Sequence, residues 1–357
     1  MRIAVDAREL AGHATGVGRY LQRLLQQWAL DRVPHAFSLY TPSPQIAAPA
    51  GLEAEIVTLT GTGGTNWEQT TLARALARDR PDLLFAPAYS APLAVRCPVA
   101  LAMHDVSFWS HPEWFGWREG ARRRLLARLS ARRARVVLTG SQFSRDEILR
   151  YLGVPASRVQ VIRYGVGMAA GLSPATVREP VVLYVGTILN RRHVPALISG
   201  FALAARQRPE LRLEIVGVNR SHPRQDLASL VASHEVARQV QLRDWVEDAE
   251  LGALYARASV FAFLSEYEGF GLTPLEALAS GAVPVVLDTP VAREVLAEAA
   301  IRVAAPAAEA VSRALLDALD PATQARIAAA RPAVLARYDW KTAAEQTLAA
   351  FEQAARR

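Results

Sequence analysis

The sequence predicts an α/β protein built from two Rossmann-like halves, and three observations support this prediction. Short apolar runs rich in β-branched residues alternate with helical patterns along the chain, which is typical of parallel sheets covered by helices. A stretch rich in glycine and small residues, 165–174, interrupts this alternation and is predicted to be a linker. The chain has 357 residues, enough for two domains of ordinary size.

The expected elements follow from the hydrophobic period of each segment. In the first half, strands are expected at 2–5, 37–40, 55–59, 82–85, 99–103, 135–138 and 159–162, and helices at 18–28, 67–78, 119–134 and 144–152. In the second half, strands are expected at 181–185, 212–216, 240–242, 260–264 and 283–287, and helices at 193–207, 224–234, 249–257, 274–280, 291–299 and 307–319. The tail around 338–348 predicts a final helix.

Composition restricts the class of protein. Cys97 is the only cysteine, which excludes an internal disulfide and a cysteine-based metal cluster. The sequence begins directly with a strand-like run and no leader, and it has no apolar stretch of the roughly 20 residues that a spanning helix needs. We therefore expect a cytoplasmic protein, with peripheral contact to the inner face of the cell membrane as a possibility.

The formal net charge is +7, and arginines concentrate in the segment 114–135 together with Trp114, Phe115 and Trp117. Three interpretations are open. Leu125, Leu126 and Leu129 share a helix face, so the arginines can be the solvated side of a helix that packs through these leucines. The segment can instead contact an anionic membrane, with the aromatic residues at the interface. Nucleic acid is not expected, because no recognition motif accompanies the charge.

Two acids eight positions apart are the strongest functional signal. Glu268 and Glu276 flank the glycine-rich turn of Ser265-Glu-Tyr-Glu-Gly-Phe-Gly-Leu-Thr-Pro-Leu-Glu-Ala-Leu-Ala-Ser-Gly281, between a predicted strand and a predicted helix. Such a turn directs backbone N–H groups and the positive end of a helix dipole at one point, which suits a phosphate. Acids on either side suit hydroxyl groups. A nucleotide-diphosphate sugar has this arrangement of groups.

Glu276 also has a purely structural interpretation. In Thr273-Pro-Leu-Glu276, Thr273 fits the N-cap of a helix that begins at Pro274, and Glu276 fits the third helical position of a capping box. Glu268 has no such role, because the helix does not need an acid in the preceding loop. Both functions of Glu276 are compatible.

Three further segments place polar or glycine residues where predicted strands end. Gly16 and Gly18 allow close approach of a ligand to the backbone, or form an ordinary strand-to-helix turn. His104 ends a buried strand, at the edge where open α/β sheets bind ligands, or has a structural role there. Gly186-Thr187, followed by Arg191-Arg192, suits a diphosphate, although the two arginines can also be a surface pair.

These segments resemble the family 4 retaining glycosyltransferases, which have the two-domain GT-B fold. The segment from Ser265 to Gly281 resembles their E-x7-E signature, His104-Asp105 their His-Asp segment, and Gly186-Thr187 through Arg191-Arg192 their phosphate-binding segment. The resemblance implies parallel sheets that face across a cleft and a last helix that crosses back to the first domain. It implies an acceptor domain at 1–168, a nucleotide-sugar domain at 169–340 and the returning helix at 341–357.

The resemblance also assigns residues. Catalytic roles fall to Glu268, His104, Arg191 and Arg192, and donor binding to Gly16, Gly18, Gly186, Thr187, Gly269, Phe270, Gly271, Leu272, Thr273 and Glu276. Arg192 stands where the family usually has lysine, and His193 where it often has asparagine. The segment 241–246 lacks the glycine-containing loop that frames the nucleotide base in many relatives.

The implied reaction is transfer of a hexosyl group from a nucleotide-diphosphate sugar to a hydroxyl, with retention at the anomeric carbon. The opening of the sequence resembles a branch of the family that is rich in mannosyltransferases. This resemblance favours GDP-mannose as the donor, with UDP-sugars as the alternative. The implied acceptor is a glycan or a lipid-linked glycan of the cell envelope. No Asp-x-Asp motif is present, and neither a metal nor another cofactor is expected. A nucleotide-sugar binding protein without catalysis, a phosphorylase and an epimerase are the other hypotheses.

Overall fold

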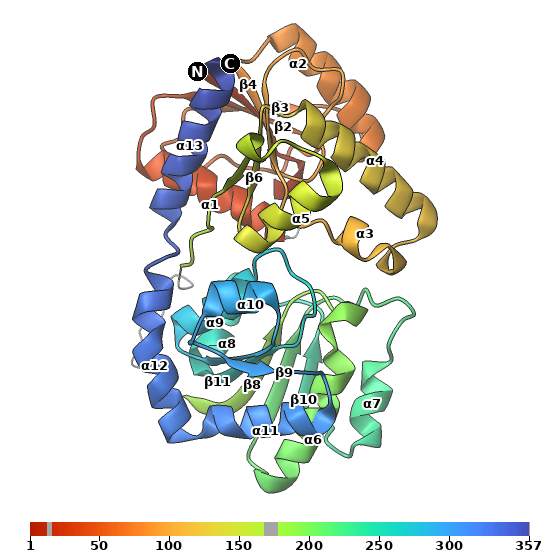
Figure 1. The fold of residues 1–357 in the computed structure, drawn as a ribbon, viewed down its shortest axis with the longest axis vertical. Coiled ribbons are helices and arrows are strands. Elements are labelled where there is room, and N and C mark those ends of the chain that lie inside the picture. Colours follow the sequence, from red (N-terminus) through yellow and green to blue (C-terminus); the bar gives the residue numbers. More distant parts are fainter. Residues whose placement is uncertain (13–15, 168–177, 357) are drawn as a thin grey trace. The chain divides into compact units, whose positions relative to one another are not determined.

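The computed structural model describes residues 1–12, 16–167 and 178–356, which form two compact units (Figure 1). Unit 1 comprises 1–165 and 338–357, and unit 2 comprises 166–337. The domain boundaries predicted from the sequence fall after residues 168 and 340, three residues later than the divisions in the structure. Residue 168 lies outside the described residues. Of the predicted linker 165–174, the structure describes residues 165–167.

In the described part of unit 1, seven parallel strands form one sheet, and all seven match predicted strands. The sheet order is β3-β2-β1-β4-β5-β6-β7. The strands are β1 (Arg2–Asp6), β2 (Ala36–Thr41), β3 (Ala54–Thr58), β4 (Leu83–Ala86), β5 (Val99–Ala102), β6 (Val136–Thr139) and β7 (Val159–Val161). The helices are α1 (Gly16–Leu30), α2 (Ala73–Asp79) after a π-helical turn (Trp67–Leu72), α3 (Ser107–Ser110), α4 (Trp117–Arg133), α5 (Gln142–Leu152) and α13 (Trp340–Arg356).

Unit 2 is a second parallel sheet with the order β10-β9-β8-β11-β12-β13. Its strands are β8 (Glu179–Val185), β9 (Arg212–Val216), β10 (Val240–Arg243), β11 (Ala258–Phe263), β12 (Val283–Leu287) and β13 (Ile301–Val303). Its helices are α6 (Val194–Gln207), α7 (Leu227–Ser233), α8 (Asp248–Arg257), α9 (Leu272–Ser280), α10 (Pro290–Leu296), α11 (Ala308–Leu319) and α12 (Pro321–Leu335).

Both sheets have the strand order of a doubly wound fold, which confirms the predicted fold class. The order reverses between β1 and β4 in unit 1 and between β8 and β11 in unit 2. Ligands of open α/β sheets bind at such reversal points, beyond the carboxyl ends of the strands. The central strands are buried on both faces, as expected for a sheet covered by helices.

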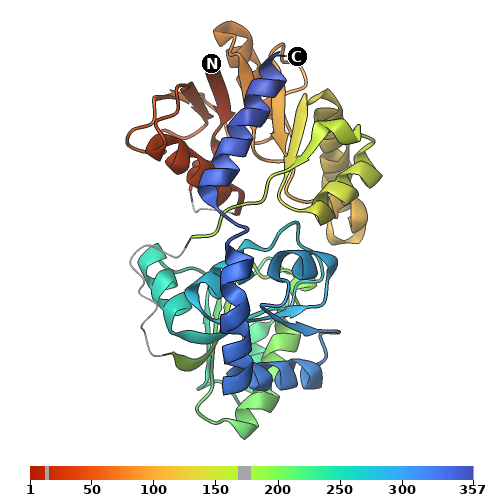
Figure 2. The same ribbon diagram turned by 60° about the vertical axis from the view of Figure 1, so that its left-hand side comes forward.

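The last helix belongs to unit 1, although unit 2 precedes it in the sequence (Figure 2). Phe351 of α13 is fully buried, and its ring centroid lies 4.8 Å from that of Phe85 and 5.9 Å from that of Trp28. The indole N–H of Trp28 donates a hydrogen bond to the carbonyl of Ala344. These contacts lie inside the core of unit 1, so the first domain is complete only with the end of the chain.

Three elements were not predicted from the sequence: α3, β13 and α12. The first two are four and three residues long, too short to show a hydrophobic period. Helix α12 is largely exposed and rich in alanine, with Ile327 and Val334 as its buried residues. It therefore lacks the apolar stripe from which a helix is usually predicted.

Helix α4 packs differently from the prediction. Its buried residues are Gly120, Ala127, Ser130 and Ala131, whereas Leu125 and Leu129 are exposed. Small residues let the helix approach its neighbours closely, so the core stripe is not made of leucines. In the part of the chain that the structure describes, no helix is both long and apolar enough to span a membrane.

Candidate active site

The predicted donor-site residues of unit 2 follow β8 and β11, the two strands that flank its reversal point. Glu268 lies in the loop after β11, and its Oε1 accepts hydrogen bonds from Nε of Arg192 and from Oγ of Ser265, each at 2.9 Å. Nη2 of Arg192 also lies 2.9 Å from this oxygen. The two side chains are 14% and 19% exposed, so this ion pair is largely shielded from water.

Arg192 connects the acid to the loop after β8. Its Nη1 donates to the carbonyl of Thr187 at 2.8 Å, and its guanidinium lies 4.9 Å from the ring centroid of Phe263. Burial by itself lowers the pKa of Arg192, but Glu268 and Tyr184 together raise it, and the net shift of the pKa is upward. Arg192 therefore stays charged beside Glu268. A lysine, with one nitrogen, cannot make these contacts simultaneously.

Gly186 is required at its position for two reasons. Its φ of +148° lies in a region that other residues rarely adopt, and a Cβ there would lie 2.9 Å from Nη1 of Arg192. The glycine therefore leaves room for the guanidinium beside the end of β8. This explains the Gly-Thr pair that precedes the arginines in the sequence.

The backbone joins the two loops at Arg191. The N–H of Glu266 donates to the carbonyl of Arg191 at 3.0 Å. His193, which has a φ of +46°, lies with Nε2 3.2 Å from Oε2 of Glu266. The histidine that replaces the family's asparagine thus forms a second contact between the same loops.

The N-terminus of α9 differs from the predicted capping box. The helix begins at Leu272, and its N-cap is Gly271 with a φ of +97° and no side-chain cap. Thr273 and Pro274 are therefore inside the first turn, and Thr273 is not the cap. Glu276 instead accepts a hydrogen bond from the hydroxyl of Tyr255 on α8, at 3.3 Å. The structural interpretation of Glu276 was wrong, because the glycine allows the helix to begin earlier.

Gly269, Phe270 and Gly271 form the turn that leads into this helix. Gly271 and Glu268 line a small pocket whose other walls come from β12 and α10. The first backbone N–H groups of a helix have no partners within the helix and attract anions. A carboxylate, two arginines and a helix N-terminus are thus gathered at one edge of the sheet of unit 2.

His104, Gly16 and Gly18 belong to unit 1, so they do not share a domain with the residues above. His104 follows β5, is half-buried, and uses both ring nitrogens: Nδ1 lies 2.7 Å from the hydroxyl of Tyr164 and Nε2 lies 2.8 Å from the carbonyl of Pro87. A carbonyl only accepts, which places the proton of the neutral ring on Nε2. Burial lowers the pKa of His104, so the ring is neutral near pH 7.

The glycine pair lies at the start of a helix. Gly16 is the first residue of α1, and Gly18, two residues further on, is buried. The preceding residues 13–15, which include Thr15 of the motif, lie outside the described residues. The predicted roles of Gly16, Gly18 and His104 toward the donor remain predictions.

Both halves of the chain are similar to known proteins. Residues 14–169 match the model of Glycosyltransferase Family 4, and residues 173–331 match the model of Glycosyl transferases group 1. Glycogen synthase of Mycobacterium tuberculosis strain H37Rv is 30% identical over 301 residues, 78% of this chain and 70% of that protein. The chain belongs to the family 4 glycosyltransferases.

Two other similar proteins add detail. O-antigen chain mannosyltransferase B of Escherichia coli is 28% identical over 264 residues, which is 70% of this glycosyltransferase and 68% of the relative. The solved structure of HepE from Anabaena in complex with UDP-glucose covers 99% of this chain and 100% of that chain, with a TM-score of 0.78 and 18% identity. At this identity the likeness establishes the fold, which is GT-B.

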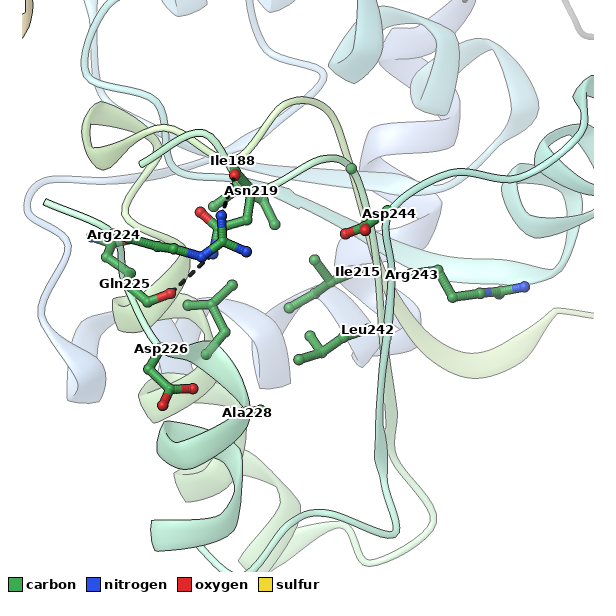
Figure 3. Close-up of a pocket in the computed structure, with 12 residues that line it drawn as sticks. Ile188, Ile215, Asn219, Arg224, Gln225, Asp226, Ala228, Leu242, Arg243 and Asp244 are labelled. Atoms are coloured by element: carbon green, nitrogen blue, oxygen red, sulfur yellow. Dashed lines mark hydrogen bonds between the residues drawn. The ribbon is translucent and has the colours of Figure 1, made fainter. Parts of the chain in front are cut away.

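A polar pocket of unit 2 was not foreseen from the sequence. It has a volume of about 400 Å³ and lies beyond the ends of β9 and β10 (Figure 3). Ile215 and Leu242 line it from the strands, and Asp244 follows β10. The amide of Asn219 donates to the carbonyl of Gln225 at 2.9 Å, which fixes the loop along the other wall.

The sequence did contain a signal for this pocket. Gly217 follows a buried strand, and the polar segment 219–226 comes directly after it. Trp245, the aromatic residue after Asp244, is 47% exposed and is not among the residues that line the pocket. In the described ranges of this glycosyltransferase, no group of three or more histidine, cysteine or acidic side chains is placed to hold a metal ion.

Proposed function

We propose that this glycosyltransferase moves a hexosyl group, favoured as mannosyl from GDP-mannose, to a hydroxyl of a glycan or a lipid-linked glycan. The observation that carries the proposal is the Arg192–Glu268 pair at the reversal point of unit 2, next to the N-terminus of α9. It provides a carboxylate for sugar hydroxyls and positive charge for a diphosphate in one place. The similarity to an O-antigen mannosyltransferase supports the choice of mannose.

The anomeric configuration is proposed to be retained by same-face transfer. The bond between the anomeric carbon and the phosphate oxygen breaks, and its electron pair stays on that oxygen. The acceptor oxygen bonds to the anomeric carbon on the same face, and its proton passes to the leaving phosphate. Arg191, Arg192 and the first N–H groups of α9 stabilise the charge on the leaving group.

Glu268 is proposed to orient the sugar and not to attack it. Arg192 and Ser265 both donate to its Oε1, and hydrogen bonding to a cation lowers the nucleophilicity of a carboxylate. Analysis of the transferred sugar by NMR tests the stereochemistry. An inverted linkage would contradict same-face transfer.

The polar pocket beyond β9 and β10 is proposed to hold the nucleotide base. The pocket lies at the same edge of the sheet as Arg191 and Arg192, which are proposed to bind the diphosphate. Ile188, which follows β8, is among its lining residues. Backbone carbonyls and the Asp244 carboxylate accept hydrogen bonds, whereas Asn219 and Arg224 donate them. Guanine and uracil both carry donors and acceptors on their edges, so this mixed lining suits either base.

A UDP-sugar is the second candidate for the donor, because HepE was solved with UDP-glucose in a similar fold. Thermal unfolding with GDP, UDP, ADP and dTDP, and with their common sugar conjugates, separates the two. A ligand at about a hundredfold over its dissociation constant adds roughly 2.7 kcal/mol to the free energy of unfolding. We expect the largest shift with GDP and GDP-mannose. A response to uridine nucleotides alone would move the donor to a UDP-sugar, and no response would favour a protein without catalysis.

The arginines are also proposed to take the place of a metal ion in neutralising the diphosphate. Sugar transfer should therefore continue in excess EDTA at its usual rate. Loss of transfer in EDTA, with recovery on addition of a divalent cation, would overturn this part of the proposal.

A further inference from the structure

Leucines and arginines on one face of helix α4 are exposed to solvent. Arg118, Arg122, Leu125, Leu129 and Arg132 follow one another at spacings of four and three residues, so they lie along one face of the helix. We call these five residues the outer stripe. Leu125 is 59% exposed and Leu129 is 38% exposed. Trp117, at the N-terminal end of the helix, is 76% exposed.

The fold does not require these apolar side chains. Helix α4 packs on unit 1 through its opposite side, where Gly120, Ala127, Ser130 and Ala131 are buried. Leu125, Leu129 and Trp117 therefore contribute little to the core of unit 1. Two leucines and a tryptophan on a single helix form an apolar surface that water solvates poorly, and such surfaces mark interaction sites.

The charge of the stripe is unbalanced within its own helix. Glu119 is the one acid of α4, and it pairs with Arg123 at 2.6 Å, beside the stripe. The arginines nearer the core have partners in unit 1: Arg124 donates to the carbonyl of Phe108, and Arg128 to that of Tyr151. The arginines of the outer stripe are exposed, and the guanidinium of Arg118 lies 5.2 Å from the ring centroid of Trp117. Their charge favours an anionic surface.

We infer that the outer stripe and Trp117 dock this protein onto the surface of an anionic lipid membrane. Lipid phosphates pair with the guanidinium groups, while the leucines and the indole enter the boundary between head groups and acyl chains. A lipid surface thus satisfies both kinds of side chain in the stripe. The helix would lie in the plane of the interface, because its other side is packed on unit 1.

Two other occupants fit the stripe less well. A second copy of the chain on a two-fold axis would bring arginines of one stripe close to those of the other. Nucleic acid would pair with the arginines but would leave Leu125, Leu129 and Trp117 without a role. The membrane proposal is independent of the donor and of the reaction, so it stands or fails separately from them.

Flotation with phosphatidylcholine vesicles, with and without phosphatidylglycerol, tests the proposal on the full chain. We expect binding to the anionic vesicles, weaker binding at high salt, and little binding to neutral vesicles. A charge variant, Arg118→Gln/Arg122→Gln/Arg132→Gln, should lower partitioning by about 100-fold. An apolar variant, Trp117→Ser/Leu125→Ser/Leu129→Ser, should also lose binding although it keeps every charge.

A matched control removes the same charge elsewhere. Arg206, Arg238 and Arg313 are exposed residues of unit 2, and Arg206→Gln/Arg238→Gln/Arg313→Gln should bind vesicles as the wild type does. Thermal unfolding of each variant shows whether it is folded. Equal loss in the control and the charge variant would reduce the effect to net charge and overturn the proposal.

Two further results would also overturn it. If the apolar variant binds anionic vesicles like the wild type, the leucines and Trp117 do not enter the lipid. If the wild type is a dimer by light scattering and the apolar variant is a monomer, the stripe is an interface between copies. Binding to an oligonucleotide that competes with vesicles and survives the apolar substitutions would assign the stripe to nucleic acid.

Discussion

Glu268 is the residue whose replacement should separate binding from transfer. In Glu268→Gln the side chain keeps its size and its contact with Ser265 but loses its charge, and the sugar loses the acceptor that orients it. We expect sugar transfer to fall by about 100-fold or more, as for loss of one oriented polar group in an active site. The dissociation constant for the nucleoside diphosphate should change much less, because Arg191, Arg192 and the first turn of α9, which are proposed to bind the diphosphate, are all kept. Turnover and calorimetric binding measure the two effects.

Glu266 supplies a matched control two residues away. It also carries a carboxylate in the loop after β11, but its contact is with His193 and its side chain is 42% exposed. Glu266→Gln should therefore keep most of the transfer activity. Full activity in Glu268→Gln would show that the active site was assigned wrongly.

Asp6 gives a pH-dependent stability at the end of β1. It is 1% exposed, and burial raises its pKa to about 6, with Glu68 adding to the rise and Arg8 opposing it. Between pH 3.8 and about 6 the folded protein keeps a proton that the unfolded chain has lost. The stabilising contribution is therefore present at low pH and is lost as the pH rises through about 6.

The variant Asp6→Asn isolates this contribution. The free energy of unfolding of the wild type, relative to the variant, should fall by up to about 3 kcal/mol as the pH rises across that window. Urea unfolding of both proteins at several pH values measures the difference. A constant difference for Asp6→Asn would mean that Asp6 does not titrate in this range.

At the scale of an element, α9 links the backbone to the proposed diphosphate site. Gly271 has a φ of +97°, and a Cβ there would meet no atom within 4 Å. Gly271→Ala therefore adds backbone strain of about 1 kcal/mol without a collision. Because this strain shifts the first turn of α9, we expect weaker binding of the nucleoside diphosphate, measured by calorimetry.

Gly153, the C-cap of α5 with a φ of +64°, provides the comparison. Gly153→Ala carries similar backbone strain at a helix end in unit 1. It should lower the melting temperature by a similar amount and leave nucleotide binding unchanged. Equal binding in Gly271→Ala and the wild type would exclude the first turn of α9 as a phosphate site.

At the scale of the whole molecule, the chain leaves unit 1, builds unit 2 and returns to complete unit 1. Phe351→Ala should therefore destabilise unit 1 by about 3–5 kcal/mol, because it empties a fully buried site between Phe85 and Trp28. Unit 2 should keep its stability and its response to GDP. Calorimetric unfolding with and without GDP distinguishes the two units.

A milder variant checks the cause. Phe351→Leu fills most of the volume and should cost less than half as much as Phe351→Ala. If Phe351→Ala instead lowers the stability of both units equally, they unfold as one body and the helix does not act on unit 1 alone.

The architecture and the positions of the polar residues along the chain could be predicted from the sequence. The predicted strands, the glycines after β8 and β11 and the acids of the second half depend on hydrophobic period and turn chemistry, which are local properties. The family resemblance then predicted the same fold that the two sheets show. The same dependence on local pattern explains why α3 and β13 were not predicted, because both are too short to show a hydrophobic period.

Which side chains contact one another depends on the packing of the folded chain. Arg192 and Glu268 are 76 positions apart, and their ion pair depends on β8 and β11 being neighbours in the sheet. The same holds for Glu276, which contacts Tyr255 and does not cap α9, and for the leucines of α4, which face solvent because smaller residues pack on unit 1. Contacts between distant segments depend on how whole elements pack, and no local spacing encodes that packing.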